Sequence, residues 1–209
     1  MPFKVFLTLF FTFSLCSFHT VAIAKEYEDI ILSLYKDFIA PTLLEDPVDD
    51  EIEKQSLAFQ NKTLEDYAFL EKKWQRELEN GVYTLLPDLL TRRAALTASR
   101  IKEKGAGVIS TVTFVDKYGL NVAQSDITKN YWNKDAFFLQ QPVPERNEEK
   151  NIYVSDVSYD PLSTRFIVTA AFPVHNKQGK QVGYTVVNFD ALELECITEG
   201  IHAYKVKDE

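Results

Sequence analysis

Residues 125–135, with the sequence SDITKNYWNKD, bring stacking, hydrogen-bonding and charged side chains together in one short stretch. Two large aromatic residues, Tyr131 and Trp132, follow a polar run and stand between Asp126 and Asp135. A phenol or indole ring offers an apolar face and a directional donor, and a carboxylate accepts charge-assisted hydrogen bonds. The stretch therefore holds the groups that stacking and polar recognition require.

A second candidate pair is Asp156 and Arg165. Asp156 alternates with Ile152 and Val154, so a strand at this position would place its carboxylate on an apolar face. Burying an unpaired carboxylate costs on the order of several kcal/mol, so we expect a partner, and Arg165 at the start of the next strand is the nearest candidate. The two residues form either a structural ion pair or part of a binding site.

Catalytic chemistry has little support in the chain. Beyond residue 24, His175, His202 and Cys196 are the histidines and the cysteine, and the patterns G-x-S-x-G, H-E-x-x-H and C-x-x-C do not occur. The acidic stretch 45–53 lacks the alternating ligands and the central glycine of a calcium loop, which favours a solvated linker. We therefore expect no enzyme, no cofactor and no metal site.

The first 24 residues have the pattern of a secretory signal peptide. They carry Lys4 and no acidic residue, an apolar run over residues 5–18, and Ala22-Ile23-Ala24 before Lys25. We predict cleavage before Lys25 and a periplasmic, soluble product, with a retained N-terminal anchor as the alternative.

The net charge limits the classes of partner that we expect, and the cysteine count limits the possible disulfides. Of 209 residues, 185 remain without the first 24, and the loss of Lys4 changes the net charge from −8 to −9. Nucleic acids and anionic lipids attract basic surfaces, so neither is an expected partner. Cys196 is then the single cysteine, which excludes an internal disulfide. We expect a monomer or a weak dimer.

Residues 25–104 show a helical period. The first predicted helix ends at Ala40-Pro41, the second begins with a cap at Thr63 and stops at Asn80-Gly81, and the third enters through Pro87 and ends at Lys104. Their apolar stripes, which we expect in the core, are Tyr27, Ile30, Ile31, Leu34 and Phe38; Tyr67, Leu70, Trp74 and Leu78; and Leu86, Leu90, Ala94, Thr97 and Ile101.

Residues 105–195 change to the period of two that strands show, and residues 196–209 form a predicted tail. Five strands are predicted, at 108–115, 120–124, 151–158, 164–174 and 180–190. Asp116 and Asn176 begin two tight turns, and Gly119 and Gly179 close them at positions that need a positive φ. The prediction is an α+β fold: a five-stranded antiparallel sheet with N-terminal helices packed against it, and one long connection at 125–150, a length typical of functional loops.

These elements resemble the Cache (PDC) domains, a family of PAS-like extracytoplasmic sensors. The resemblance runs from about Leu70 to Leu194 and depends most on GLNVAQSDIT followed by YW, and on the terminal hairpin FPVHNKQGKQVGYTVVNFDAL. It implies a single Cache domain in which the segment between the second and third strands forms a wall of a ligand cavity over the sheet.

The resemblance also assigns expected roles. Tyr131 and Trp132 would form an apolar or cation-stacking wall, Asp126 and Asp135 would accept from an amine or cationic ligand, and Asp156 and Arg165 complete the candidate ligand-binding set. The implied function is an exported sensor that binds a small molecule and relays it to an inner-membrane signalling protein. The alternative is a ligand-free adaptor that regulates a membrane receptor or cyclase. A plugged cavity would favour the adaptor, and an open cavity with convergent polar groups would favour the sensor.

Overall fold

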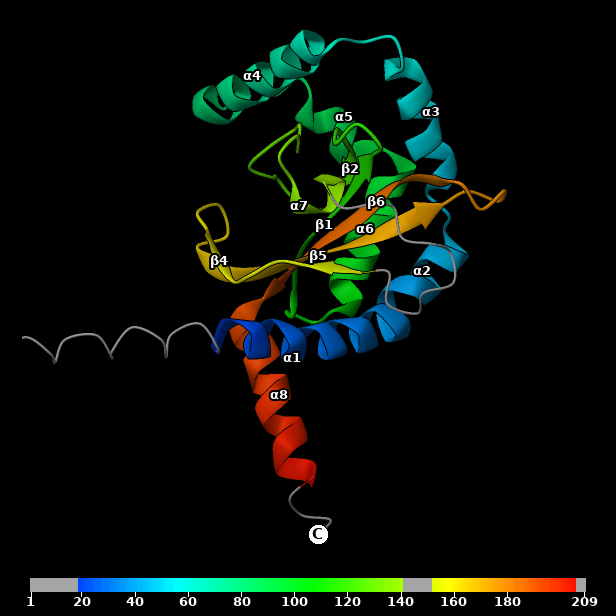
Figure 1. Ribbon diagram of the computed structural model, residues 1–209. Coiled ribbons are helices and arrows are strands. Elements are labelled where there is room, and N and C mark those ends of the chain that lie inside the picture. Colours follow the sequence, from blue (N-terminus) through cyan, green and yellow to red (C-terminus); the bar gives the residue numbers. More distant parts are fainter. Residues whose placement is uncertain (1–18, 141–151, 206–209) are drawn as a thin grey trace, which may run out of the picture.

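An antiparallel sheet with helices packed against it makes an α+β structure, as the sequence predicts (Figure 1). The computed structural model describes residues 19–140 and 152–205. Residues 1–18, which make up most of the predicted signal peptide, lie outside the described residues, as do residues 141–151 of the long connection.

The sheet has the strand order β2-β1-β6-β5-β3, and β4 pairs with β5 beside β3. Its strands are β1 (Ile109–Asp116), β2 (Asn121–Gln124), β3 (Tyr153–Val154), β4 (Ser158–Asp160), β5 (Arg165–His175) and β6 (Gln181–Asp190). The two longest strands, β5 and β6, pair along almost their whole length at the centre. Five strand positions were predicted, and the sixth strand arises because the predicted strand 151–158 is divided.

That division occurs at residues 155–157, between β3 and β4. The Ser155 N–H still donates to the Thr169 carbonyl oxygen at 2.8 Å, so the chain follows β5 through the break. Asp156 itself is exposed and lies outside both strands. The prediction that Asp156 places its carboxylate on an apolar face is wrong, because it assumed one unbroken strand over residues 151–158.

Both predicted hairpin turns are confirmed. Gly119 and Gly179 have φ values of +85° and +77°, and their N–H groups donate to the Asp116 and Asn176 carbonyl oxygens at 3.0 and 2.8 Å. The side chains that open the turns also hold them, because Asp116 Oδ1 accepts from the Tyr118 and Leu120 amides. These are the contacts expected of Asx residues at the start of a turn.

Helices α1 (His19–Leu34), α2 (Ala40–Glu45), α3 (Asp49–Phe59) and α6 (Arg93–Lys104) supply the core on one face of the sheet. Ile31 of α1, Ile52 of α3 and Ile101 of α6 are buried there with Phe114, Phe172 and Phe189 of the strands. Tyr27 and Ile31 lie beyond the predicted cleavage site at Lys25, and both are buried. α1 is continuous across residue 24, and cleavage stays a prediction.

The first helical segment does not end at Ala40-Pro41. A π-helical turn, η1 (Tyr35–Ile39), follows α1, and the Ala40 N–H donates to the Tyr35 carbonyl oxygen. Proline lacks an N–H, and its ring collides with the carbonyl group four residues earlier in a regular α-helix. The wider turn just before Pro41 accommodates the ring, so the chain continues into α2.

The acidic stretch 45–53 is not a linker. Asp49, Asp50 and Glu51 form the first turn of α3, where negative side chains favour the positive end of the helix dipole. Glu51 also accepts from the Ala94 backbone N–H at 3.1 Å and thereby satisfies a free amide at the start of α6.

Helix α4 (Leu64–Asn80) has the predicted ends, with Thr63 and Asp66 in a capping box and Gly81 in the left-handed conformation. The predicted third helix is two helices, α5 (Leu86–Thr91) and α6, separated by Arg92 in an extended conformation. The Arg92 guanidinium donates to Gln55 Oε1 at 2.6 Å and to the Val122 carbonyl oxygen at 2.8 Å. These tertiary contacts explain a break that the local sequence does not signal.

The chain after β6 forms helix α8 (Ala191–Lys205), which covers most of the predicted tail 196–209. Asp190 Oδ1 caps its start by accepting from the Leu192 and Glu193 amides. Leu194 is buried, whereas Cys196 is exposed and not packed as an apolar side chain. Across residues 19–140 and 152–205, no helix is both long and apolar enough to traverse a bilayer.

Candidate functional site

The recognition segment, residues 125–135, folds back along the start of β2. The Asn121 N–H donates to the Tyr131 carbonyl oxygen at 2.9 Å, the Asn133 N–H donates to the Gly119 carbonyl oxygen at 2.7 Å, and Leu120 and Trp132 form an isolated β-bridge. The Asn133 side chain adds a bond from Nδ2 to Asn121 Oδ1 at 2.8 Å. The polar residues of the segment therefore hold its own backbone in place.

Helix α4 holds the same segment from the other side. One oxygen of Glu71, Oε2, accepts from the Tyr131 and Trp132 backbone N–H groups at 2.9 and 2.8 Å. Trp74 Nε1 donates to the Thr128 carbonyl oxygen at 3.0 Å, and Gln75 Nε2 donates to the Lys129 carbonyl oxygen at 2.8 Å. One face of α4 thus binds the backbone of consecutive segment residues.

Trp132 lies at the junction of these elements. Its indole Nε1 donates to the Tyr118 carbonyl oxygen at 3.0 Å, and its ring meets Tyr67 of α4 edge-on, with centroids 5.6 Å apart. The side chain is half-buried. The Lys134 ammonium group lies 5.8 Å from the ring centroid, within the range of a cation–π contact.

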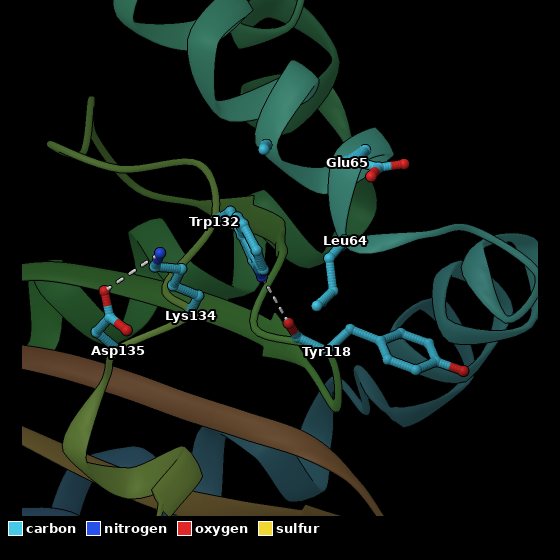
Figure 2. A pocket seen from close by; sticks show the side chains of 7 residues that line it. Leu64, Glu65, Tyr118, Trp132, Lys134 and Asp135 are labelled. Carbon is cyan, nitrogen blue, oxygen red and sulfur yellow. Dashed lines mark hydrogen bonds and ion pairs between the residues drawn. The ribbon is translucent and has the colours of Figure 1, made fainter.

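A pocket of about 540 Å³ opens beside this indole, and we call it the Trp132 pocket (Figure 2). Its lining residues are Leu64, Glu65, Ala68, Tyr118, Trp132, Lys134 and Asp135. The first three belong to the start of α4, and the last three belong to the recognition segment. In Figure 2, Lys134 and Asp135 lie on one side of the indole, and Leu64 and Tyr118 lie on the other.

Two of the six predicted site residues, Trp132 and Asp135, line this pocket. Tyr131 is instead 5% exposed, with its ring centroid 6.0 Å from that of Trp74. Burial raises the pKa of Tyr131 to about 12. Tyr131 therefore anchors the segment in a core shared with α4.

Asp126 has a partner outside the pocket. Its carboxylate accepts from Lys102 Nζ of α6 at 2.6 Å and from the Ser125 hydroxyl group at 2.6 Å. This ion pair ties the start of the recognition segment to α6.

The expected pairing of Asp156 with Arg165 is wrong. Arg165 donates from NH1 to Asp190 Oδ2 at 2.6 Å, next to the cap of α8, and Asp156 is exposed in the break between β3 and β4. The register pairs Arg165 with Asp160 across β4 and β5, so Asp156 lies four residues further along the edge. The Asp190 carboxylate, on the neighbouring central strand, provides the nearer partner.

Sequence reasoning missed Lys134, Tyr118 and the first turn of α4 as pocket residues, and Glu71 as the residue that holds the segment. Lys134 stands between two predicted residues, so its position was a usable signal. Glu71 follows Tyr67 by four residues and precedes Trp74 by three, which places a carboxylate on the packed face of α4. Nothing local indicated that the start of α4 lies beside Trp132.

The Cache resemblance implies a cavity over the sheet, and the face of the sheet opposite helices α1, α3 and α6 carries a separate apolar cluster. Phe138 of α7 (Phe137–Gln140) packs there on Tyr184 of β6, with ring centroids 4.9 Å apart, in a cluster with Val115 and Ala171. Further along the sheet, Thr113 pairs with Gln124, which is fully buried. Gln124 Nε2 has no hydrogen-bond partner among residues 19–140 and 152–205. The described part of this face is apolar and filled at one end, and polar at the other.

No family model matches the chain, and no curated protein matches it. Among solved structures, it is similar to an extracellular ligand binding receptor from Desulfohalobium retbaense, at 11% identity and a TM-score of 0.40. That match covers 87% of this chain, which spans 27% of the receptor.

Two chemoreceptor domains are also similar. The sensory domain of Campylobacter jejuni Tlp3, solved with isoleucine bound, matches at 12% identity and a TM-score of 0.36, over 87% of this chain and 66% of that one. The ligand-binding domain of the Pseudomonas aeruginosa amino acid chemoreceptor PctC, in complex with GABA, matches at 14% identity and a TM-score of 0.35, over 66% of this chain and 61% of that one. These structures are extracellular ligand-binding domains, and at such identities and TM-scores they assign no ligand to this chain.

Proposed function

We propose that this chain is an exported sensor domain of the Cache type, which binds a small molecule in the Trp132 pocket and relays binding to an inner-membrane signalling protein. The observation that carries the proposal is the composition of the pocket. It combines an indole face, a phenol-bearing residue and three charged side chains in about 540 Å³, within the usual volume of small-molecule sites.

The position of the pocket supports a relay. Its two walls come from α4 and from the recognition segment, and the bonds of Glu71, Trp74 and Gln75 join the same two elements. A ligand that contacts both walls changes the free energy of their docking, and α4 is then the element that moves or stiffens. A partner that binds α4 differently in the two states would receive the signal.

A ligand-free adaptor is the second candidate. The resemblance implies a cavity over the sheet, and the adaptor is favoured because Phe138 covers Tyr184 on one face of that sheet. In that case the pocket beside Trp132 is a surface depression, and α4 presents a fixed surface to the partner.

A thermal-shift screen separates the two functions. The protein is screened against amino acids, amines, carboxylates and nucleobases, and a ligand at one hundred times its dissociation constant stabilises it by about 2.7 kcal/mol. Trp132→Ala should reduce the shift, whereas Tyr159→Ala, which truncates an exposed aromatic ring on β4, should keep it. A screen without a single shift would favour the adaptor, whereas a shift equal in wild type and Trp132→Ala would mean that the ligand binds outside the Trp132 pocket.

A further inference from the structure

The Trp132 pocket already contains a cation. The Lys134 ammonium group lies 5.8 Å from the indole centroid and 3.9 Å from Asp135 Oδ2, on one side of the ring (Figure 2). It thus occupies the place where a cationic ligand would contact both the ring face and a carboxylate. The lysine makes, within the chain, the two contacts that such a ligand would make.

These contacts hold Lys134 weakly. Its side chain is 57% exposed and that of Asp135 is 82% exposed, so solvent screens the pair. A lysine side chain also has many rotamers, and confining it costs conformational entropy. The ammonium group can therefore leave the indole face without unfolding any element.

The remaining charges of the pocket are negative. Glu65, on the first turn of α4, and Asp135 are its two acidic lining residues, and Lys134 is its basic one. The pocket carries a net charge of −1 with Lys134 in place and −2 without it. An organic cation gains attraction when Lys134 withdraws, and a carboxylate ligand loses its only opposite charge in the lining.

We infer that Lys134 acts as a resident cation that competes with the ligand of the Trp132 pocket, and that the ligand is an organic cation such as a quaternary or primary amine. The inference depends on the proposed function, because it names the ligand class of the same pocket. Lys134 then sets the affinity threshold of the sensor, since a ligand must displace it to reach the indole.

The two tryptophans provide the measurement. Trp74 and Trp132 are the two in the chain, so the indole N–H region of a ¹H–¹⁵N spectrum contains one signal from the pocket and one from the core. Tetramethylammonium and acetate are titrated at constant ionic strength into wild type, Lys134→Met and Lys117→Met. Lys117 is the matched control, because it lies 4.9 Å from the Tyr118 ring centroid and is not part of the pocket lining.

Tetramethylammonium should shift the Trp132 signal and leave that of Trp74 in place. It should bind Lys134→Met about two- to fivefold more tightly than wild type, as expected when one exposed cation–π contact no longer competes. Lys117→Met should bind like wild type. Unchanged backbone spectra confirm that both variants are folded.

Equal affinity of Lys134→Met and Lys117→Met for tetramethylammonium would overturn the inference, as would acetate binding that Lys134→Met abolishes. In the second case Lys134 is a ligand partner for anions. Either result leaves the proposed function standing if a compound from the screen still moves the Trp132 signal. A screen in which no compound moves it would remove the proposed function itself.

Discussion

At the scale of single residues, Glu71 holds the recognition segment from outside the pocket lining. One carboxylate oxygen accepts from two consecutive amides, those of Tyr131 and Trp132, and the other accepts from Gln75. Charge-assisted bonds of this kind are stronger than neutral ones, and amides that lose their acceptor are costly if they stay buried. The position of the indole therefore depends on a side chain outside the pocket lining.

Glu71→Ala should lower the free energy of unfolding by about 1–3 kcal/mol and speed hydrogen exchange at the Tyr131 and Trp132 amides. Glu71→Gln keeps an acceptor and should cost less. Urea unfolding and hydrogen exchange on both variants provide the measurement, and Glu79→Ala, an exposed acid on the same helix, is the control. Unchanged exchange at the two amides in Glu71→Ala would show that α4 does not hold the segment.

Tyr131 should make stability depend on alkaline pH. Burial raises its pKa from 10.0 to about 12, so the folded state resists loss of the phenolic proton. Because the folded state holds the phenolic proton more tightly than the unfolded chain does, the shift contributes to stability. This contribution is fully present below pH 10, the unfolded pKa, and is lost as the pH rises from 10 to about 12, the folded pKa. Between pH 9 and pH 11, wild type should lose about 1.4 kcal/mol more than Tyr131→Phe in urea unfolding. Parallel losses in the two proteins would mean that Tyr131 is not buried.

At the scale of elements, the sequence correctly predicted those helix ends and turns that neighbouring residues determine. The Thr63 cap, the stop at Gly81 and the turns at Gly119 and Gly179 depend on neighbouring residues, and all four are confirmed. Trp132 and Asp135, predicted from one short polar segment, both line the pocket, and their role in ligand binding stays a prediction.

The elements that were wrongly predicted depend on distant partners. The break at Arg92 requires Gln55 and the Val122 carbonyl group, and the partner of Arg165 is Asp190, on a strand that follows it by a full hairpin. The π-helical turn before Pro41 lets the helical segment continue into α2, where the local sequence predicts the end of a helix. Local sequence could not predict the whole pocket either, because three of its seven lining residues come from the start of α4.

Both hairpin glycines should tolerate a β-branched side chain poorly. Gly119→Val and Gly179→Val both place a β-branched residue at positive φ, at a cost of about 1–3 kcal/mol each. At Gly119 a Cβ atom would also lie 2.8 Å from Leu139 Cδ1 and 3.4 Å from the Asn133 backbone. Urea unfolding should therefore show a loss for both variants, and wild-type stability in either variant would refute the turn assignment.

At the scale of the whole molecule, two regions are candidates for recognition. One is the face of the sheet that Phe138 covers, and the other is the Trp132 pocket between the segment and α4. The segment is bonded to β2 on one side and to α4 on the other, so a change in its position must affect both. We propose that the ligand binds on the α4 side, in the Trp132 pocket.

The most direct test of this claim is the affinity of a screened ligand for Trp132→Ala, measured on folded protein. The account predicts binding weaker by about 1–3 kcal/mol, with a smaller loss in the free energy of unfolding, because the indole is half-buried and lines the pocket from one side. Wild-type affinity in the folded variant, together with a stability loss of about 3–5 kcal/mol, would contradict it, since Trp132 would then be a core residue and not a recognition wall.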